Sequence, residues 1–124
     1  MGCLIITNNP LVKKKFNNVC FVEGTMEEVL IKVRNLVYEK FELVTHPLGA
    51  SLRIMFSPYR SIIIGEKNQR LNTTHVEIIE GSIDKYKEHM KLRKEDLKNA
   101  DDYALIDLTL LEAAFSELEN IIIS

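Results

Sequence analysis

Short apolar runs alternate with helical patterns in the first half of this chain. The runs at 3–7, 19–22 and 41–45 are rich in β-branched and aromatic residues, have the length of strands and end in turn-forming residues. Between them, 11–16 has room for a short helix and 26–40 has the spacing of a longer one. Strand, helix, strand, helix, strand with short connections predicts a parallel sheet with right-handed crossovers.

Capping residues support both of these helices. Pro10 suits the first turn of a helix, and Asn9 before it is a good N-cap. Thr25 begins the second helix with Glu28 three residues later, which is a capping-box pattern. One face of that helix is apolar and is expected to pack on the sheet; its members are Val29, Leu30, Val33, Leu36 and Val37.

A fourth strand is expected at 60–65. The linker 46–59 that leads to it shows no helical pattern, and a parallel crossover without a helix is uncommon. We therefore expect this last strand to run antiparallel to the third. An antiparallel return would bring Tyr59 and Arg60 close to His46.

The second half of the chain is predicted to be helical. Asp101 and Asp102 indicate a break and an N-cap before a last helix at 103–120, and isoleucines 121–123 are expected to pack on the sheet or on a partner. The stripe of the earlier helix is Val76, Ile79, Ile83, Tyr86 and Met90, and the apolar face of the last helix is Leu105, Ile106, Leu108, Leu111, Phe115 and Leu118.

These patterns predict one α/β domain over residues 1–124. Its sheet is expected to be small and mostly parallel, with about four strands, the last antiparallel, and flanking helices. Residues 1–66 carry the strand and helix alternation, and 72–123 form a helical half that packs on it.

Composition narrows the class of protein. A hydrophobic fraction of 46% and a charged fraction of 27% are ordinary for soluble domains, so a core can form without disulfides or metals. The net charge of -2 argues against nucleic acid as the main partner. No leader pattern and no long apolar run is seen, so we expect a cytoplasmic protein without membrane contact. Cys3 and Cys20 are expected to be small buried hydrophobes.

Polar residues gather where the predicted strands end. The loops 7–9, 23–25 and 45–47 would share one edge of a parallel sheet, and two of them lead into helix N-termini, which attract anions. Arg60 would add a bidentate donor. The same residue types are also ordinary caps and turn formers. The candidate ligand-binding residues are Thr7, Asn8, Asn9, Thr45, His46, Ser57, Tyr59, Arg60 and Ser61.

His46 is the candidate catalytic residue. As a general base it would need a nucleophile, for which Ser51, Ser57 and Ser61 are available, and an orienting acid, for which Glu23 is the candidate. Alternatively, His46 only holds the loop before Pro47 in shape. The three histidines, which are His46, His75 and His89, form no ligand spacing, and no cofactor motif is present, so no metal and no cofactor are expected.

Two short polar motifs, taken together, resemble the GrdX family. They are residues 4–10, LIITNNP, and 45–48, THPL; SPYRSI at 57–62 and ALIDL at 104–108 agree. The resemblance implies a cytoplasmic accessory or regulatory protein encoded beside the glycine, sarcosine or betaine reductase complex of amino-acid-fermenting anaerobes. The chain departs from the family pattern after Leu48, where the mainly apolar segment 52–56, LRIMF, replaces a polar segment. That change favours a packed or partner-facing segment over ligand contacts.

Three functions follow as hypotheses. The leading one is a non-catalytic accessory protein of anaerobic glycine reductase metabolism that contacts a reductase component or reports on a small metabolite. The second is a small enzyme or sensor that binds an anionic metabolite, with His46 as acid–base and Arg60 as anchor. The third is a homodimer built through the helical half.

Overall fold

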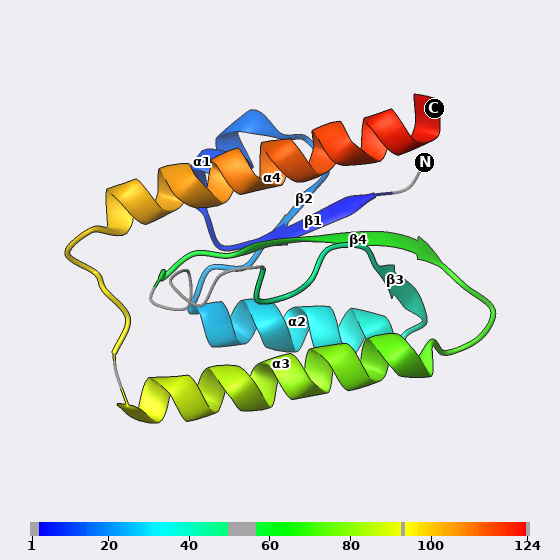
Figure 1. The fold of residues 1–124 in the computed structure, drawn as a ribbon, viewed down its shortest axis with the longest axis horizontal. Coiled ribbons are helices and arrows are strands. Elements are labelled where there is room, and N and C mark those ends of the chain that lie inside the picture. Colours follow the sequence, from blue (N-terminus) through cyan, green and yellow to red (C-terminus); the bar gives the residue numbers. More distant parts are fainter. Residues whose placement is uncertain (1–2, 50–56, 93, 124) are drawn as a thin grey trace.

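The computed structural model describes residues 3–49, 57–92 and 94–123. Its centre is a sheet with the strand order β2-β1-β4-β3 (Figure 1). The strands are β1 (Leu4–Thr7), β2 (Val19–Phe21), β3 (Phe41–Leu43) and β4 (Ser61–Lys67).

The sheet is mixed and not mostly parallel, which corrects the sequence-based expectation. β1 pairs with β2 in parallel, but β4 pairs antiparallel with both β1 and β3. The prediction of an antiparallel fourth strand is confirmed. It changes the sheet more than expected because β4 inserts between β1 and β3 instead of adding at an edge, so two of the three pairings become antiparallel.

In the described ranges, four helices flank the sheet. They are α1 (Pro10–Lys15), α2 (Met26–Tyr38), α3 (Thr73–Leu92) and α4 (Ala100–Ile123). Both predicted caps are confirmed, because the Asn9 side chain accepts from the amide of Leu11 and the Thr25 side chain accepts from the amide of Glu28. The predicted break at 101–102 is wrong. Both aspartates lie in the first turn of α4, where negative charge favours the helix dipole.

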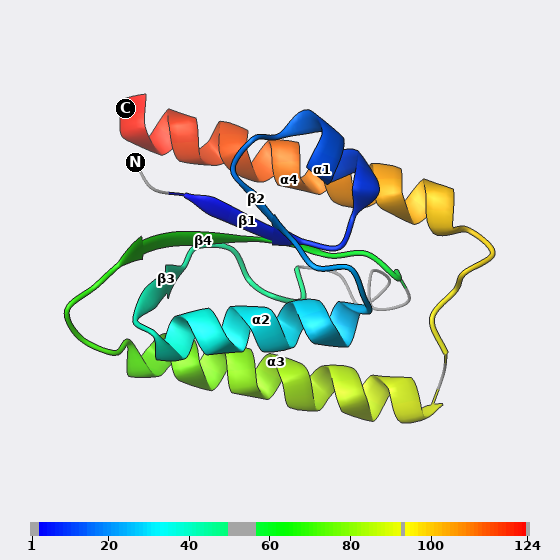
Figure 2. The same cartoon turned by 180° about the vertical axis from the view of Figure 1, so that it is seen from behind.

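The helices form two layers. α2 and α3 cover one face of the sheet, and α1 and α4 cover the other, as the two opposite views show (Figures 1 and 2). Neighbouring strand residues point to opposite faces. Ile6 and Ile62 therefore pack in the α2–α3 core, while Ile5 and Ile63 pack in the α1–α4 core. The two cysteines are free and half-buried, one against each core, rather than fully buried.

The two long helices use their apolar faces differently. The stripe on α3 is confirmed, since Ile79, Ile83 and Tyr86 are buried against α2 and the sheet. On α4, Leu111 is buried, whereas Leu105 is 58% exposed, so the apolar face is narrower than expected. A helix lying on a sheet buries only the stripe that faces it. The side chains of residues 121–123 and the segment 52–56 lie outside the described residues.

Within the described ranges, no helix is both long enough and apolar enough to cross a membrane.

Candidate functional site

The candidate site lies where β1 ends and β4 begins. Thr7 is the register partner of Ser61 in the antiparallel pairing, so their side chains stand next to each other. The two hydroxyl oxygens are 2.7 Å apart. α4 passes over this end of the sheet on the α1 side (Figure 1).

A carboxylate from α4 closes the site. Asp107 is only 3% exposed. One of its oxygens, Oδ1, accepts from the amide of Ser61 at 2.9 Å, and the other, Oδ2, accepts from the Ser61 hydroxyl at 2.6 Å. Oδ2 also accepts from Nδ2 of Asn9 at 3.0 Å. Asn9 Nδ2 donates in addition to the carbonyl of Ala104 at 2.8 Å, which ties the loop after β1 directly to α4.

The hydroxyl groups here have a fixed direction of donation. The carboxylate of Asp107 can only accept, so the Ser61 hydroxyl must donate to it. The Thr7 hydroxyl then donates to Ser61 Oγ, and it accepts from the amide of Asn9 at 2.9 Å. The resulting series of hydrogen bonds runs from Asn9 through Thr7 and Ser61 to Asp107. We call these four residues the Asp107 cluster.

Asn8 organises the neighbouring loops. Its Nδ2 donates to the carbonyls of Gly24 at 3.0 Å and Pro58 at 2.8 Å, and its Oδ1 accepts from the amide of Arg60 at 3.0 Å. Both hydrogens of this amide are thereby used. Asn8 therefore joins the loops after β1 and β2 to the segment that enters β4.

Three of the remaining candidates serve as turn formers or strand partners. The Ser57 hydroxyl donates to the carbonyl of Tyr59 at 2.9 Å and accepts from its amide at 3.1 Å, which is a local turn. The Thr45 hydroxyl accepts from the amide of Ile63 at 2.9 Å, which continues the pairing of β4 just beyond β3.

Arg60 is 3% exposed, which is unusual for an arginine. Burial lowers the pKa of its guanidinium, and the nearby negative charge of Asp107 acts in the opposite direction. The favourable interaction with this carboxylate offsets part of the cost of burying the positive charge. Arg60 is thus part of the interior, and it does not extend into solvent.

His46 lies at the edge of this arrangement and is exposed. Its Nδ1 accepts from the amide of Leu48 at 3.1 Å, and its carbonyl accepts from the amide of Gly49 at 3.2 Å. Desolvation lowers the pKa of its imidazole, and the positive charges of Lys85 and Arg60 lower it further. These contacts are the loop-holding role that the sequence left open for His46.

The structure brings some of the candidates together and leaves others apart. Thr7, Asn9 and Ser61 share one cluster, and Asn8 links that cluster to the segment 58–60. Within the part of the chain that the structure describes, no hydrogen bond joins His46 to Ser57 or Ser61. The acid at this site is Asp107, and Glu23 is exposed. Ser51 lies outside the described residues.

Asp107 was missed as a site residue, although a signal existed. Counted from Ala104, Asp107, Leu108 and Leu111 follow after three, four and seven residues, which is the spacing of one helix face. A single acid on an apolar helix face must find partners once that face is buried. For metals, no group of three or more histidines, cysteines, aspartates or glutamates comes together in the described ranges.

Comparison with known protein families identifies the family of this chain. A model of the family described as GrdX-like protein matches residues 4–116, which include the whole Asp107 cluster. The chain belongs to the GrdX-like family. No curated protein and no solved structure matches it. The segments that resemble the GrdX family also supply the Asp107 cluster. Asn9 comes from 4–10, Ser61 from 57–62 and Asp107 from 104–108.

Replacing Asp107 tests the importance of its carboxylate. In Asp107→Asn the single amide oxygen cannot accept all three bonds, and the amide group faces N–H donors. We expect the free energy of unfolding to fall by about 1–3 kcal/mol, the cost of leaving buried polar groups unsatisfied. Urea denaturation measures the change. The control is Asp84→Asn on the exposed surface of α3, expected within about 0.5 kcal/mol of the parent; equal effects of the two variants would contradict the assigned role.

The pH response of His46 tests its electrostatic surroundings. We expect its imidazole to titrate below the usual pKa of about 6.5 in the folded chain. The unfolded chain then takes up this proton first, so the contribution of His46 to stability is full above that pH and declines as the pH falls toward the folded pKa. NMR titration of the ring protons measures the value.

The same titration has a matched pair of variants. Lys85→Gln removes one of the positive charges and should raise the pKa of His46 toward its usual value. Lys14→Gln removes an exposed charge from α1, on the opposite face of the sheet, and should leave that pKa unchanged. A His46 pKa at or above 6.5 in the parent chain would show that the assigned surroundings are wrong.

Proposed function

We propose that the protein is a non-catalytic accessory or regulatory protein linked to anaerobic glycine reductase metabolism. The observation that carries this proposal is the internal use of the polar groups at the candidate site. The hydroxyl of Ser61 donates to Asp107, the amide of Asn8 binds two carbonyls, and the side chain of Asn9 binds α4. These bonds hold the fold together.

A catalytic role would require a different arrangement of these side chains. A nucleophilic serine needs a base in reach that can take its proton, and here the partner of Ser61 is a buried carboxylate whose own capacity is shared among three donors. The Nδ1 of His46 already accepts a hydrogen bond from the amide of Leu48. This arrangement supports a structural role for the cluster and hence an accessory role for the protein.

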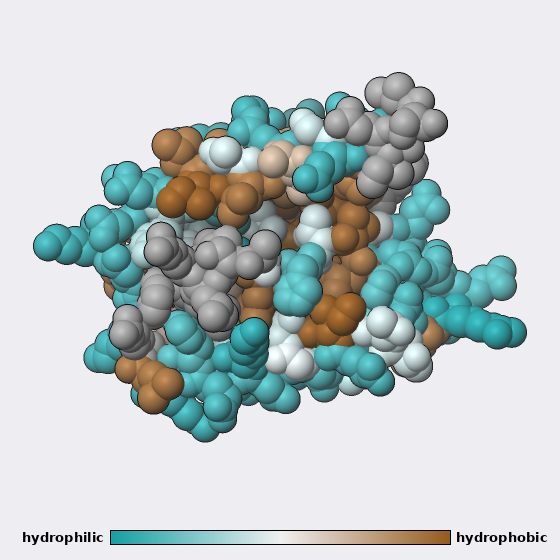
Figure 3. All heavy atoms as spheres, in the orientation of Figure 1, coloured by the Kyte–Doolittle hydropathy of each residue, from teal (hydrophilic) through white to brown (hydrophobic). Residues whose placement is uncertain are grey.

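The outer face of α4 supports contact with another protein. Leu105, Ile106 and Leu110 are all exposed along the first half of this helix. Figure 3 shows hydrophobic side chains gathered over the same helix, with hydrophilic surface beside them. The partner we propose is a component of glycine reductase, in line with what the family resemblance implies. A second copy of this chain is the competing occupant.

A second candidate function is a sensor or small enzyme for an anionic metabolite at the strand edge. The observation that favours it is the positive charge of Lys85 and Arg60 around His46. It ranks second because Arg60 is buried and lies near the negative charge of Asp107. A ligand would have to compete with that carboxylate for the guanidinium.

The α4 surface can be tested with charge-introducing variants. Leu105→Lys combined with Leu110→Lys should weaken binding to purified glycine reductase components about tenfold or more, since an interface would have to bury two unpaired charges. Surface plasmon resonance measures the affinity. Leu92→Lys with Leu97→Lys is the matched control, because these leucines are 84% and 65% exposed but lie at the end of α3 and in the connection after it. Absence of binding to every component would contradict the proposed partner.

Light scattering separates the competing occupant from the proposed one. A monomeric parent chain supports a reductase partner and contradicts the homodimer. A parent of twice the chain mass that the α4 double variant converts to monomer would assign this surface to a second copy.

A further inference from the structure

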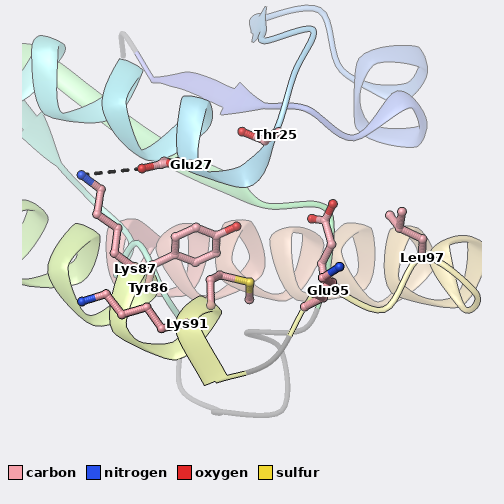
Figure 4. Close-up of a pocket in the computed structure, with 9 residues that line it drawn as sticks. Thr25, Glu27, Tyr86, Lys87, Lys91, Glu95 and Leu97 are labelled. Carbon is pink, nitrogen blue, oxygen red and sulfur yellow. Dashed lines mark ion pairs between the residues drawn. The ribbon is translucent and has the colours of Figure 1, made fainter.

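A pocket lies in the α2–α3 layer, on the opposite face of the sheet from α4. Its volume is about 520 Å³, which is in the usual range for sites of small metabolites. It is bounded by the N-terminus of α2 at Thr25, the last turns of α3, and the start of the connection to α4 (Figure 4). None of the candidates from the sequence that fall within the described ranges lines it.

The interior wall of the pocket carries an unused hydroxyl. Tyr86 is 6% exposed, yet its phenol borders the pocket, and its hydroxyl points toward the side of Glu95 (Figure 4). Among the described residues this hydroxyl forms no hydrogen bond. Burial raises the pKa of Tyr86, and the negative charges of Glu95 and Glu27 raise it further, so the phenol is protonated at neutral pH. It can therefore donate to a ligand oxygen and accept from a ligand N–H.

Charges of both signs surround the pocket, and among the described residues some of them are paired and others are not. Lys87 of α3 and Glu27 of α2 form an ion pair at 3.7 Å (Figure 4). In the described part of the chain, Glu95, Lys91 and Lys94 belong to no ion pair, although all three line the pocket. The N-terminus of α2 adds a partial positive charge beside Thr25.

Apolar side chains complete the lining. Met90 and the ring of Tyr86 come from α3, and Leu97, which is exposed, comes from the connection. An apolar surface next to unpaired charges of both signs is complementary to a molecule that carries the same three features. A purely anionic ligand would meet Glu95, and a purely cationic one would meet the lysines and the end of α2.

We propose that this pocket binds a small zwitterion of the α-amino-acid type, which has an ammonium group, a carboxylate and a short apolar body. Glu95 receives the ammonium group. Lys91, Lys94 and the N-terminus of α2 receive the carboxylate, and the Tyr86 hydroxyl binds one of the two. Met90 and Leu97 contact the apolar body. This site goes beyond the accessory role and does not depend on it.

Charge-deleted probes test this directly. NMR titrations of the labelled chain with alanine, valine, leucine and phenylalanine should shift the amide signals of Tyr86 and Leu97. For the best binder, the N-acetyl derivative lacks the ammonium group and the amide derivative lacks the carboxylate. Each should bind about tenfold more weakly, as expected for the loss of one charge-assisted contact.

Matched variants assign the two charges. Glu95→Gln should weaken the amino acid about tenfold but leave its N-acetyl derivative unchanged, and Lys91→Gln with Lys94→Gln should weaken the amino acid while leaving the amide derivative unchanged. Lys14→Gln with Lys32→Gln removes the same charge from exposed sites outside the pocket and should change neither. The far-ultraviolet circular dichroism of every variant should match that of the parent.

Three results would overturn the proposal. The first is that no amino acid of the panel shifts the pocket signals. The second is that the N-acetyl or amide derivative binds as tightly as the parent amino acid. The third is that the lysine control weakens binding as much as the pocket variants, which would indicate a general effect of net charge.

Discussion

The buried carboxylate of Asp107 is the interaction on which the rest of the structure depends. A charge that is removed from water is costly unless hydrogen bonds and an opposite charge replace the solvent. Here the amide and hydroxyl of Ser61, the amide group of Asn9 and the nearby charge of Arg60 take that place. Because these partners come from the start of β4 and the loop after β1, the carboxylate fixes α4 on the sheet.

That attachment also decides which surfaces are left for function. With Asp107 and Leu111 facing inward, the helical period turns Leu105 and Ile106 outward, where they form part of the apolar surface of α4. The Asp107 carboxylate also accepts hydrogen bonds from polar groups at the strand ends, which are therefore not available to a ligand. Among the described residues, Tyr86 on α3 and Lys94 and Glu95 just after it keep polar groups without a partner, and all three line the pocket beside α2 and α3.

Local signals in the sequence were enough to predict the helices and strands, but not to predict how these elements assemble. The caps at Asn9 and Thr25 and the antiparallel direction of β4 follow from residues close in sequence, and all three are confirmed. The place of β4 between β1 and β3 depends on non-local pairing, which periodicity does not encode. Likewise, Asn9 and Asp107 are 98 positions apart, so no spacing argument connects them. The candidate residues at 7–9 and 60–61 did come together, but around an acid that the sequence analysis had not selected.

Hydrogen exchange at the amide of Ser61 tests the central role of Asp107 most directly. This amide opens β4, at the end of a strand, where an N–H bonded only to water would exchange rapidly. If the buried carboxylate holds it, its exchange should be as slow as that of Ile63 inside the strand and should require unfolding of the whole chain. Exchange of the Ser61 amide at the rate of an unprotected residue, while Ile63 stays protected, would contradict the account.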